Sequence, residues 1–86
     1  MEVILTLDAK EDLDYWKKIN KPAYLKKIRT LIESIIETPY QGIGKPEALK
    51  HSFSGCWSRG INQEHRLVYE IKGDVIYILS LRGHYE

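Results

Sequence analysis

The second half of the chain carries three strand-like runs joined by very short connections. The runs are CWSRGI (56–61), HRLVYEI (65–71) and DVIYILSLR (74–82), and only NQE and KG separate them. Each run is rich in β-branched or aromatic residues, as strands are. Connections this short favour hairpins, so residues 56–82 are predicted to form an antiparallel meander. The rest of the chain has to pack on that sheet.

The first half supplies one more strand and two helices. EVILTL (2–7) has the length and composition of a strand, and Asp8 with Glu11 has capping-box spacing for a helix through about Ile19. Pro22 suits the first turn of a second helix. Apolar residues recur in that helix at three- and four-residue spacing, which predicts a buried face: Ile28, Leu31, Ile32, Ile35 and Ile36.

The resulting order, βααβββ, describes an α+β fold in which two helices pack on one face of an antiparallel sheet. TPYQGIGKPEALKH (38–51) has too many Pro and Gly residues for a regular element and is predicted to be a loop with charges on it. With 86 residues in total, the chain is expected to form a single domain, residues 1–86.

Composition excludes several classes of protein. The chain is 43% hydrophobic and 29% charged, which is ordinary for a globular protein and too apolar for a disordered one. No apolar run approaches the roughly 18–20 residues that cross a bilayer, and MEVILTLDAKED lacks the basic start and cleavage site of a signal peptide. Cys56 is the single cysteine and can form no internal disulfide. We expect a cytoplasmic protein without a membrane contact.

Metal binding is not expected either. The three histidines lie far apart in the sequence, and neither a C-x-x-C pair nor an H-x-x-x-H pair is present. Charge is nearly balanced overall, at +1, but residues 44–66 hold four cations against two glutamates. That segment is either an ordinary solvated surface or a mild anion-binding patch.

Strand alternation gathers polar residues on one face of the meander. In the run 65–71, Leu67, Tyr69 and Ile71 fall on one face, and Arg66, Val68 and Glu70 on the other. If KG closes a tight hairpin, Arg66 lies opposite Ser80 with Arg82 on the diagonal. The last run would then deliver His84 and Tyr85 to the end of the sheet where Arg66 begins.

A carboxylate in a basic loop, an arginine on a strand and a terminal imidazole with a phenol suit one chemistry in particular. In RNA cleavage by the 2′-hydroxyl, a base takes the 2′ proton, a cation stabilises charge on the phosphate, and an acid protonates the leaving 5′-oxygen. An imidazole, with an unperturbed pKa of about 6.5, can donate that proton near neutrality. RNA supplies the nucleophile, so the reaction requires no metal or other cofactor.

Several motifs together resemble a known family. GKPE-x-LK-H, SG-x-WSR, EHRLVY and the terminal HY, with YW at 15–16, are similar to the YoeB-type toxins of the RelE superfamily. Members of that family are ribosome-dependent messenger-RNA endonucleases that a YefM-type antitoxin holds inactive. The resemblance covers most of the chain.

The resemblance implies a role for each matching residue. It assigns Glu47 as general base, Arg66 as phosphate clamp, His84 as general acid, and Tyr85 as a residue that stacks on or orients a base. A further set would contact phosphates or ribosomal RNA: Lys45, Lys50, Arg59 and Arg82.

Each assignment has a structural alternative. His84 can be a surface histidine near a tail, Arg66 can form a surface ion pair with Glu64 or Glu70, and Glu47 can be a solvated loop carboxylate. Trp57 could stack on RNA but fits a core position better. Four more residues are interpreted as structural, the histidines through hydrogen bonds and the others through packing: His51, His65, Tyr15 and Trp16.

The chain departs from the family pattern at a few positions. Gly60 stands where a second basic residue is common, and Cys56 where an aromatic is common. Gly83 replaces a bulkier residue, and Glu86 extends past the usual HY ending. These departures predict weaker RNA or ribosome contact at residue 60 and a looser terminus.

Two functions follow as hypotheses. The first is an endoribonuclease toxin that cuts messenger RNA in the A site of the 70S ribosome and inhibits translation. The alternative is a catalytically weak docking protein that binds an antitoxin for autoregulation or blocks another target. The resemblance implies a YefM/Phd-type antitoxin as partner, contact with DNA only through the antitoxin complex, and a homodimer.

Overall fold

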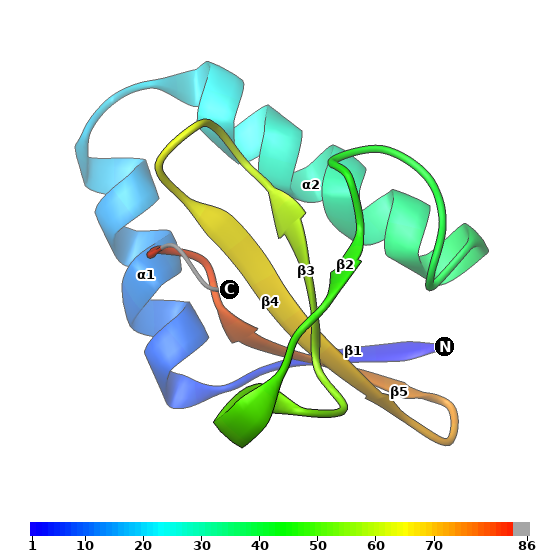
Figure 1. Ribbon diagram of the computed structural model, residues 1–86. Coiled ribbons are helices and arrows are strands. Elements are labelled where there is room, and N and C mark those ends of the chain that lie inside the picture. The colour runs from blue at the N-terminus through cyan, green and yellow to red at the C-terminus, as the bar shows by residue number, and fades with distance from the viewer. Residues whose placement is uncertain (84–86) are drawn as a thin grey trace.

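The computed structural model describes residues 1–83 and consists of a five-stranded sheet with two helices packed on one face (Figure 1). Spatial strand order is β1-β5-β4-β3-β2. In chain order the elements are β1 (Glu2–Leu5), α1 (Leu7–Lys18), α2 (Pro22–Glu37), β2 (Glu47–Ala48), the 3₁₀ turn η1 (His51–Phe53), β3 (Trp57–Gly60), β4 (Arg66–Lys72) and β5 (Val75–Ser80). His84, Tyr85 and Glu86 lie outside the described residues.

The predicted strand, two helices and antiparallel meander are confirmed, but the sheet is mixed. β3, β4 and β5 pair antiparallel, whereas β1 pairs parallel with β5, with Glu2 opposite Val75 and Leu5 opposite Ile78. A parallel pair needs a long connection between its strands, and nearly the whole chain lies between β1 and β5. The prediction of a purely antiparallel sheet was therefore wrong for its first strand.

The predicted loop 38–51 contains a short strand. In β2, Glu47 pairs with Ser58 and Ala48 with Trp57, so two residues extend the sheet beyond β3. Pro46 precedes this pair, and η1 follows it. The Pro and Gly residues limit β2 to two residues without preventing it. The segment 38–51 is therefore irregular except for this short strand and η1.

The first helix begins earlier than its sequence signal suggests. Thr6, rather than Asp8, is the N-cap: its Oγ1 accepts from the Ala9 amide at 3.2 Å and donates to the Leu79 carbonyl at 3.1 Å. Asp8 lies in the first turn of α1, where a negative charge is favourable next to the helix dipole. Thr6 thus ties the start of α1 to the end of β5.

The main core lies between the helices and the sheet. In β4, Leu67 and Tyr69 are fully buried under the helices, as the alternation predicted, while Val68 is buried on the opposite face. The predicted apolar face of α2 is buried at Ile28, Leu31 and Ile35. Ile36 is 40% exposed, so the buried face of α2 is narrower than predicted.

The helices give no sign of a membrane span. Within residues 1–83, neither helix is long and apolar enough to cross a bilayer.

Candidate functional site

The sheet face away from the helices, here called the open face, carries Glu47, Ser58, Arg66 and Val68. Ser58 is fully buried there and pairs with Glu47 on one side and Val68 on the other. Directly opposed residues of neighbouring strands share a face, so Glu47 and Arg66 both lie around Ser58. The sequence-predicted carboxylate and arginine are thus brought together.

Arg66 is held in a fixed orientation. Its Nε donates to Ser58 Oγ at 2.8 Å, and its Nη2 donates to the Lys45 carbonyl at 2.8 Å and the Ser58 carbonyl at 3.1 Å. The alternative of a surface ion pair does not hold in residues 1–83, where Glu64 lies against His65 and Glu70 against Lys72. Arg66 is half-buried, and these hydrogen bonds fix the orientation of its planar guanidinium.

Glu47 and the two nearby lysines are exposed. Glu47 sits on β2 rather than in a loop, and no carboxylate–cation pair involving it is recorded among residues 1–83. Lys45 has a positive φ of 52°, and its carbonyl accepts from Arg66. Lys50 precedes η1 and is exposed. The side chains of Glu47, Lys45 and Lys50 are all open to a ligand on this edge of the sheet.

Arg59 is not available to RNA, contrary to the sequence prediction. It is 0% exposed and points into the helix-covered face, and each of its five N–H groups has an acceptor. The acceptors are Tyr69 Oη, Ser34 Oγ and the carbonyls of Thr38, Gln41 and Ile43, at 2.7–3.3 Å. Arg59 therefore fixes the loop that leads to Lys45 and Glu47.

The loop closes tightly around that guanidinium. Gly42 and Gly44 have φ of 117° and 81°, and a Cβ would come within 2.6 Å of Ser34 Oγ and 2.7 Å of Leu31 Cδ2, respectively. Both conformation and space therefore require glycine. Tyr69, on the other side of the guanidinium, has a raised pKa because its phenol is buried, although its hydrogen bond with Arg59 opposes this effect.

The end of β5 approaches Arg66 in a register different from the predicted one. A bulge between Val68 and Tyr69 sets Ser80 opposite Val68, so Arg66 lies beyond the paired end of β5. Its backbone N–H donates to the Gly83 carbonyl at 2.9 Å. The predicted pairing of Arg66 with Ser80 was wrong for two reasons. Ile71 pairs with Ile76 instead of Val75, so the hairpin starts one residue out of the predicted register, and the bulge adds a second residue that hairpin counting cannot detect. His84 nevertheless follows directly after the residue bonded to Arg66.

Three side chains hold residues 80–83. Asp12 Oδ2 accepts from the Leu81 amide at 3.0 Å, and Trp16 Nε1 donates to the Leu81 carbonyl at 2.8 Å. His65 Nδ1 accepts from the Gly83 amide at 2.9 Å. His65 is therefore a hydrogen-bonded structural histidine, as predicted, and Trp16, 1% exposed, is a packing residue. No local pattern in the sequence indicated the role of Asp12.

Gly83 is tied at both its amide and its carbonyl, and its φ is 99°. A residue with a side chain rarely adopts that conformation, so glycine is suited to this turn. The predicted looser terminus concerns residues 84–86, which lie outside the described residues. The ring of His51 is exposed and makes none of the side-chain hydrogen bonds recorded within residues 1–83, so its predicted structural bond is absent there.

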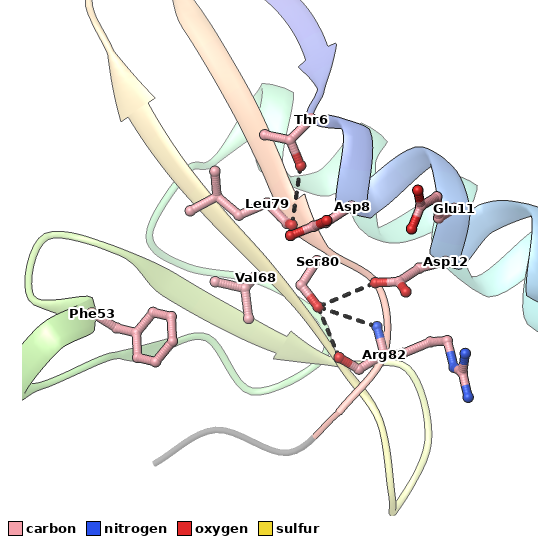
Figure 2. Close-up of a pocket in the computed structure, with 9 residues that line it drawn as sticks. All are labelled: Thr6, Asp8, Glu11, Asp12, Phe53, Val68, Leu79, Ser80 and Arg82. Carbon is pink, nitrogen blue, oxygen red and sulfur yellow. Dashed lines mark hydrogen bonds between the residues drawn. The ribbon is translucent and has the colours of Figure 1, made fainter.

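A hollow of about 520 Å³ lies beside Val68 on the open face (Figure 2). Thr6, Asp8, Glu11, Asp12, Phe53, Val68, Leu79, Ser80 and Arg82 line it. The guanidinium of Arg82 lies 3.6 Å from the centre of the Tyr15 ring, and Figure 2 shows it pointing away from Phe53. Arg82 is exposed, but it stacks on α1 instead of joining Arg66.

Phe53 is the aromatic side chain that sequence reasoning missed. It is 40% exposed and lines the hollow from η1, and Val68 of β4 lines the same hollow (Figure 2). Trp57, by contrast, packs against the main core and against Tyr40 at 4.9 Å, as its core interpretation predicted. Phe53 lies in a short segment with no helical or strand periodicity, so the sequence does not indicate which way its side chain points.

Cys56 does not supply a nucleophile to this face. Its thiol is buried beside Leu49 and Val68, and burial raises its pKa, with the Glu70 carboxylate adding to the effect. A thiol with a raised pKa is mostly protonated at neutral pH and unreactive. Among residues 1–83, no three acidic, histidine or cysteine side chains gather so as to hold a metal ion.

The open face thus offers one fixed cation, one exposed carboxylate and two exposed lysines. Such a set suits a phosphodiester, because Arg binds phosphate oxygens through a planar fork.

Comparison with known proteins gives consistent matches over almost the whole chain. A family model described as a YoeB-like toxin of bacterial type II toxin–antitoxin systems matches residues 5–85. Toxin YoeB of Escherichia coli K12 is 45% identical over 85 residues, which cover 99% of this chain and all of that protein.

Solved structures agree with that match. A YoeB/ParE toxin from Agrobacterium tumefaciens superposes with a TM-score of 0.93 at 37% identity and covers 99% of this chain and 100% of that one. A Staphylococcus aureus toxin at 41% identity is similar both in a YoeB–YefM complex, with a TM-score of 0.88, and as a YoeB dimer, with a TM-score of 0.90. Each comparison covers 99% of this chain and 98% of the other.

Proposed function

Because the chain belongs to the YoeB-like toxins of bacterial type II toxin–antitoxin systems, we propose that it is an endoribonuclease that cuts messenger RNA in the ribosomal A site. The observation that carries the proposal is the anchoring of Arg66. Its guanidinium is fixed beside Ser58 on the face that carries Glu47, and its amide holds the carbonyl of Gly83, the residue before His84.

In the proposed reaction, the RNA 2′-oxygen attacks the neighbouring phosphorus and the bond to the 5′-oxygen breaks. Glu47 takes the 2′ proton, and His84 gives a proton to the leaving 5′-oxygen, so a cyclic phosphate and a 5′-hydroxyl remain. Arg66 stabilises the charge that grows on the phosphate oxygens, where a fixed donor is most effective. Tyr85 orients the base.

The test is cleavage on ribosomes programmed with a defined message and mapped by primer extension. We expect A-site cutting by the wild type and a loss of about 10²–10⁴-fold in His84→Ala, since that is the usual contribution of a positioned acid or base. Lys72→Gln, a substitution at the far end of β4, is the matched control and should cut normally. Uncut message together with intact antitoxin binding would favour a docking protein instead.

The partners form part of the same proposal. The YoeB–YefM complex and the YoeB dimer of the Staphylococcus aureus relative support a YefM-type antitoxin and a homodimer for this chain. We propose that the antitoxin covers the open face, and that the toxin acts in the cytoplasm, where the ribosomes are. Full cutting activity in the presence of saturating antitoxin would contradict occlusion of the site.

A further inference from the structure

The hairpin of α1 and α2 concentrates positive charge far more than the rest of the chain. Six of the thirteen Lys and Arg residues fall between residues 17 and 29, a stretch that contains no Asp or Glu. These residues, here called the basic hairpin, are Lys17, Lys18, Lys21, Lys26, Lys27 and Arg29. Elsewhere twelve acidic residues outnumber the remaining seven cations, so a nearly neutral chain carries one strongly positive surface.

The charges of the basic hairpin are available to a ligand. Five of the six residues are exposed and Lys27 is half-buried. The two salt bridges recorded within residues 1–83 involve none of the six. Lys21 lies 6.0 Å from the ring centre of Tyr24, the one aromatic contact recorded for the group there.

Helix stability does not explain the placement in α2. Positive charge is favourable near a helix C-terminus, which accounts for Lys17 and Lys18 at the end of α1. At the start of α2 the sign is wrong: Lys21 is the N-cap without a side-chain capping bond, and the first turn has no acidic residue. A Ser or Asp would cap α2 better than Lys21 does. Lys26, Lys27 and Arg29 lie beyond the first turn, where the helix dipole has little effect, so it does not account for them either.

The basic hairpin belongs to the helical layer, on the face of the sheet opposite Glu47 and Arg66 (Figure 1). Lys17 of α1 and Arg29 of α2 line one shallow, mostly apolar hollow between the two helices, which Glu33 also lines. Cations of both elements thus lie at its edges. A ligand bound here would leave the open face clear.

We propose that the basic hairpin is a second RNA-binding surface, which holds the phosphate backbone of a folded RNA while the open face takes the messenger. If the proposed function holds, that folded RNA is ribosomal RNA. Five of the six residues are lysines, which protein–protein interfaces generally lack but which phosphate backbones attract as point charges. An acidic protein segment in the hollow is the competing occupant.

Salt dependence distinguishes direct phosphate contacts from other binding. Each contact releases counterions, so the logarithm of the binding constant falls with the logarithm of salt concentration by about 0.7–0.9 per contact. Loss of two contacting cations should therefore lower that slope by about 1.4–1.8.

The experiment compares two double variants of equal net charge. Lys26→Gln/Arg29→Gln removes two charges from the basic hairpin, and Lys10→Gln/Lys72→Gln removes two exposed charges outside it. Binding of a short blunt RNA duplex is followed by fluorescence anisotropy from low to physiological salt. For the first variant we expect the salt slope to be lower by about 1.4–1.8 and the affinity at low salt to be lower by at least about tenfold. The second variant should keep the wild-type slope.

Folding is checked in the same proteins by urea denaturation. Gln keeps a high helix propensity and both positions are exposed, so the hairpin variant should be about as stable as the wild type. A drop in RNA affinity without a drop in stability then reflects lost contacts. Failure of the wild type to bind the duplex, or equal effects of the two variants, would overturn the inference.

Antitoxin affinity and cutting activity separate the remaining outcomes. If the hairpin variant binds the duplex normally but binds antitoxin weakly, the surface docks a protein and the inference is wrong. The duplex assay involves neither ribosomes nor cleavage. Absence of cutting on ribosomes would thus refute the proposed function without affecting the RNA-binding role of the basic hairpin. An unchanged salt slope in Lys26→Gln/Arg29→Gln would refute that role without affecting the proposed function.

Discussion

At the scale of single residues, Arg59 shows how one side chain can be misassigned. Its position in the SG-x-WSR motif suggested contact with RNA, yet it is buried with five hydrogen bonds. The signal was present in the sequence: Trp57 was predicted to face the core, and Arg59, two residues on in a strand, has to face the same way. A buried arginine usually needs acceptors, and no nearby carboxylate in the sequence suggested one. Most of the acceptors of Arg59 are backbone carbonyls, which a sequence does not display.

Conservative substitution of Arg59 should therefore cost stability. In Arg59→Lys the ammonium cannot satisfy all five acceptors, and some buried carbonyls lose their partners. We expect the free energy of unfolding to fall by about 2–4 kcal/mol, measured by urea denaturation. Arg29→Lys, an exposed exchange of the same kind, should change it by less than about 0.5 kcal/mol. Equal midpoints for the two variants would mean that the loop does not depend on the guanidinium.

Tyr69 should make the fold lose stability at alkaline pH. Burial raises the pKa of its phenol in the folded state above the unfolded value, so its contribution is complete below that value. It is lost as pH rises through the folded pKa, because the unfolded chain releases the proton first. We expect the unfolding free energy of the wild type to fall more steeply above pH ~10 than that of Tyr69→Phe.

The comparison with Tyr69→Phe isolates this one group, because all other tyrosines are shared. At neutral pH the variant should be less stable by about 1 kcal/mol, since it lacks the 2.6 Å hydrogen bond to the Pro39 carbonyl. The gap between the two proteins should then narrow as pH increases. Parallel curves from neutral to alkaline pH would contradict a buried, titrating phenol.

At the scale of elements, periodicity and short connections predicted the helices and the meander well. The errors lie where pairing is decided in three dimensions. The two-residue β2, the parallel direction of β1 and the bulge near Val68 each depend on a neighbour distant in sequence. For the site, Glu47 and Arg66 are on one face as predicted, but the ties from Asp12 and His65 to the end of β5 had no local signal.

The end of β5 gives a prediction for His65 as a positioning residue. His65→Ala removes the acceptor of the Gly83 amide and should lower cutting on programmed ribosomes by about tenfold, because a small misplacement of a catalytic segment is costly. His65→Asn offers an oxygen at a similar distance from the backbone and should recover part of the loss. Messenger binding should stay unchanged in both. Equal activity of the alanine and asparagine variants would argue against positioning through this bond.

At the scale of the whole molecule, the open face and the basic hairpin lie on opposite faces of one small domain. If both bind RNA as proposed, we expect the ribosome to assemble the active arrangement. The molecule measures only 33 × 26 × 24 Å, so both surfaces belong to one small body. Under the proposed function, the open face offers the messenger few fixed contacts, and the basic hairpin lies in the helical layer on the other face of the sheet. We therefore expect ribosomal RNA, bound at the basic hairpin, to supply the alignment of the messenger.

Cutting of naked messenger should accordingly be slower than cutting on the ribosome by about 10²-fold or more, the scale on which positioning accelerates reactions. Primer extension on the same message, with and without ribosomes, measures the ratio, and a His84→Ala preparation controls for contaminating nucleases. Lys26→Gln/Arg29→Gln should reduce only the ribosomal rate, because the naked strand does not use the basic hairpin. Equal rates on naked and ribosome-bound message would show that the open face aligns its substrate unaided.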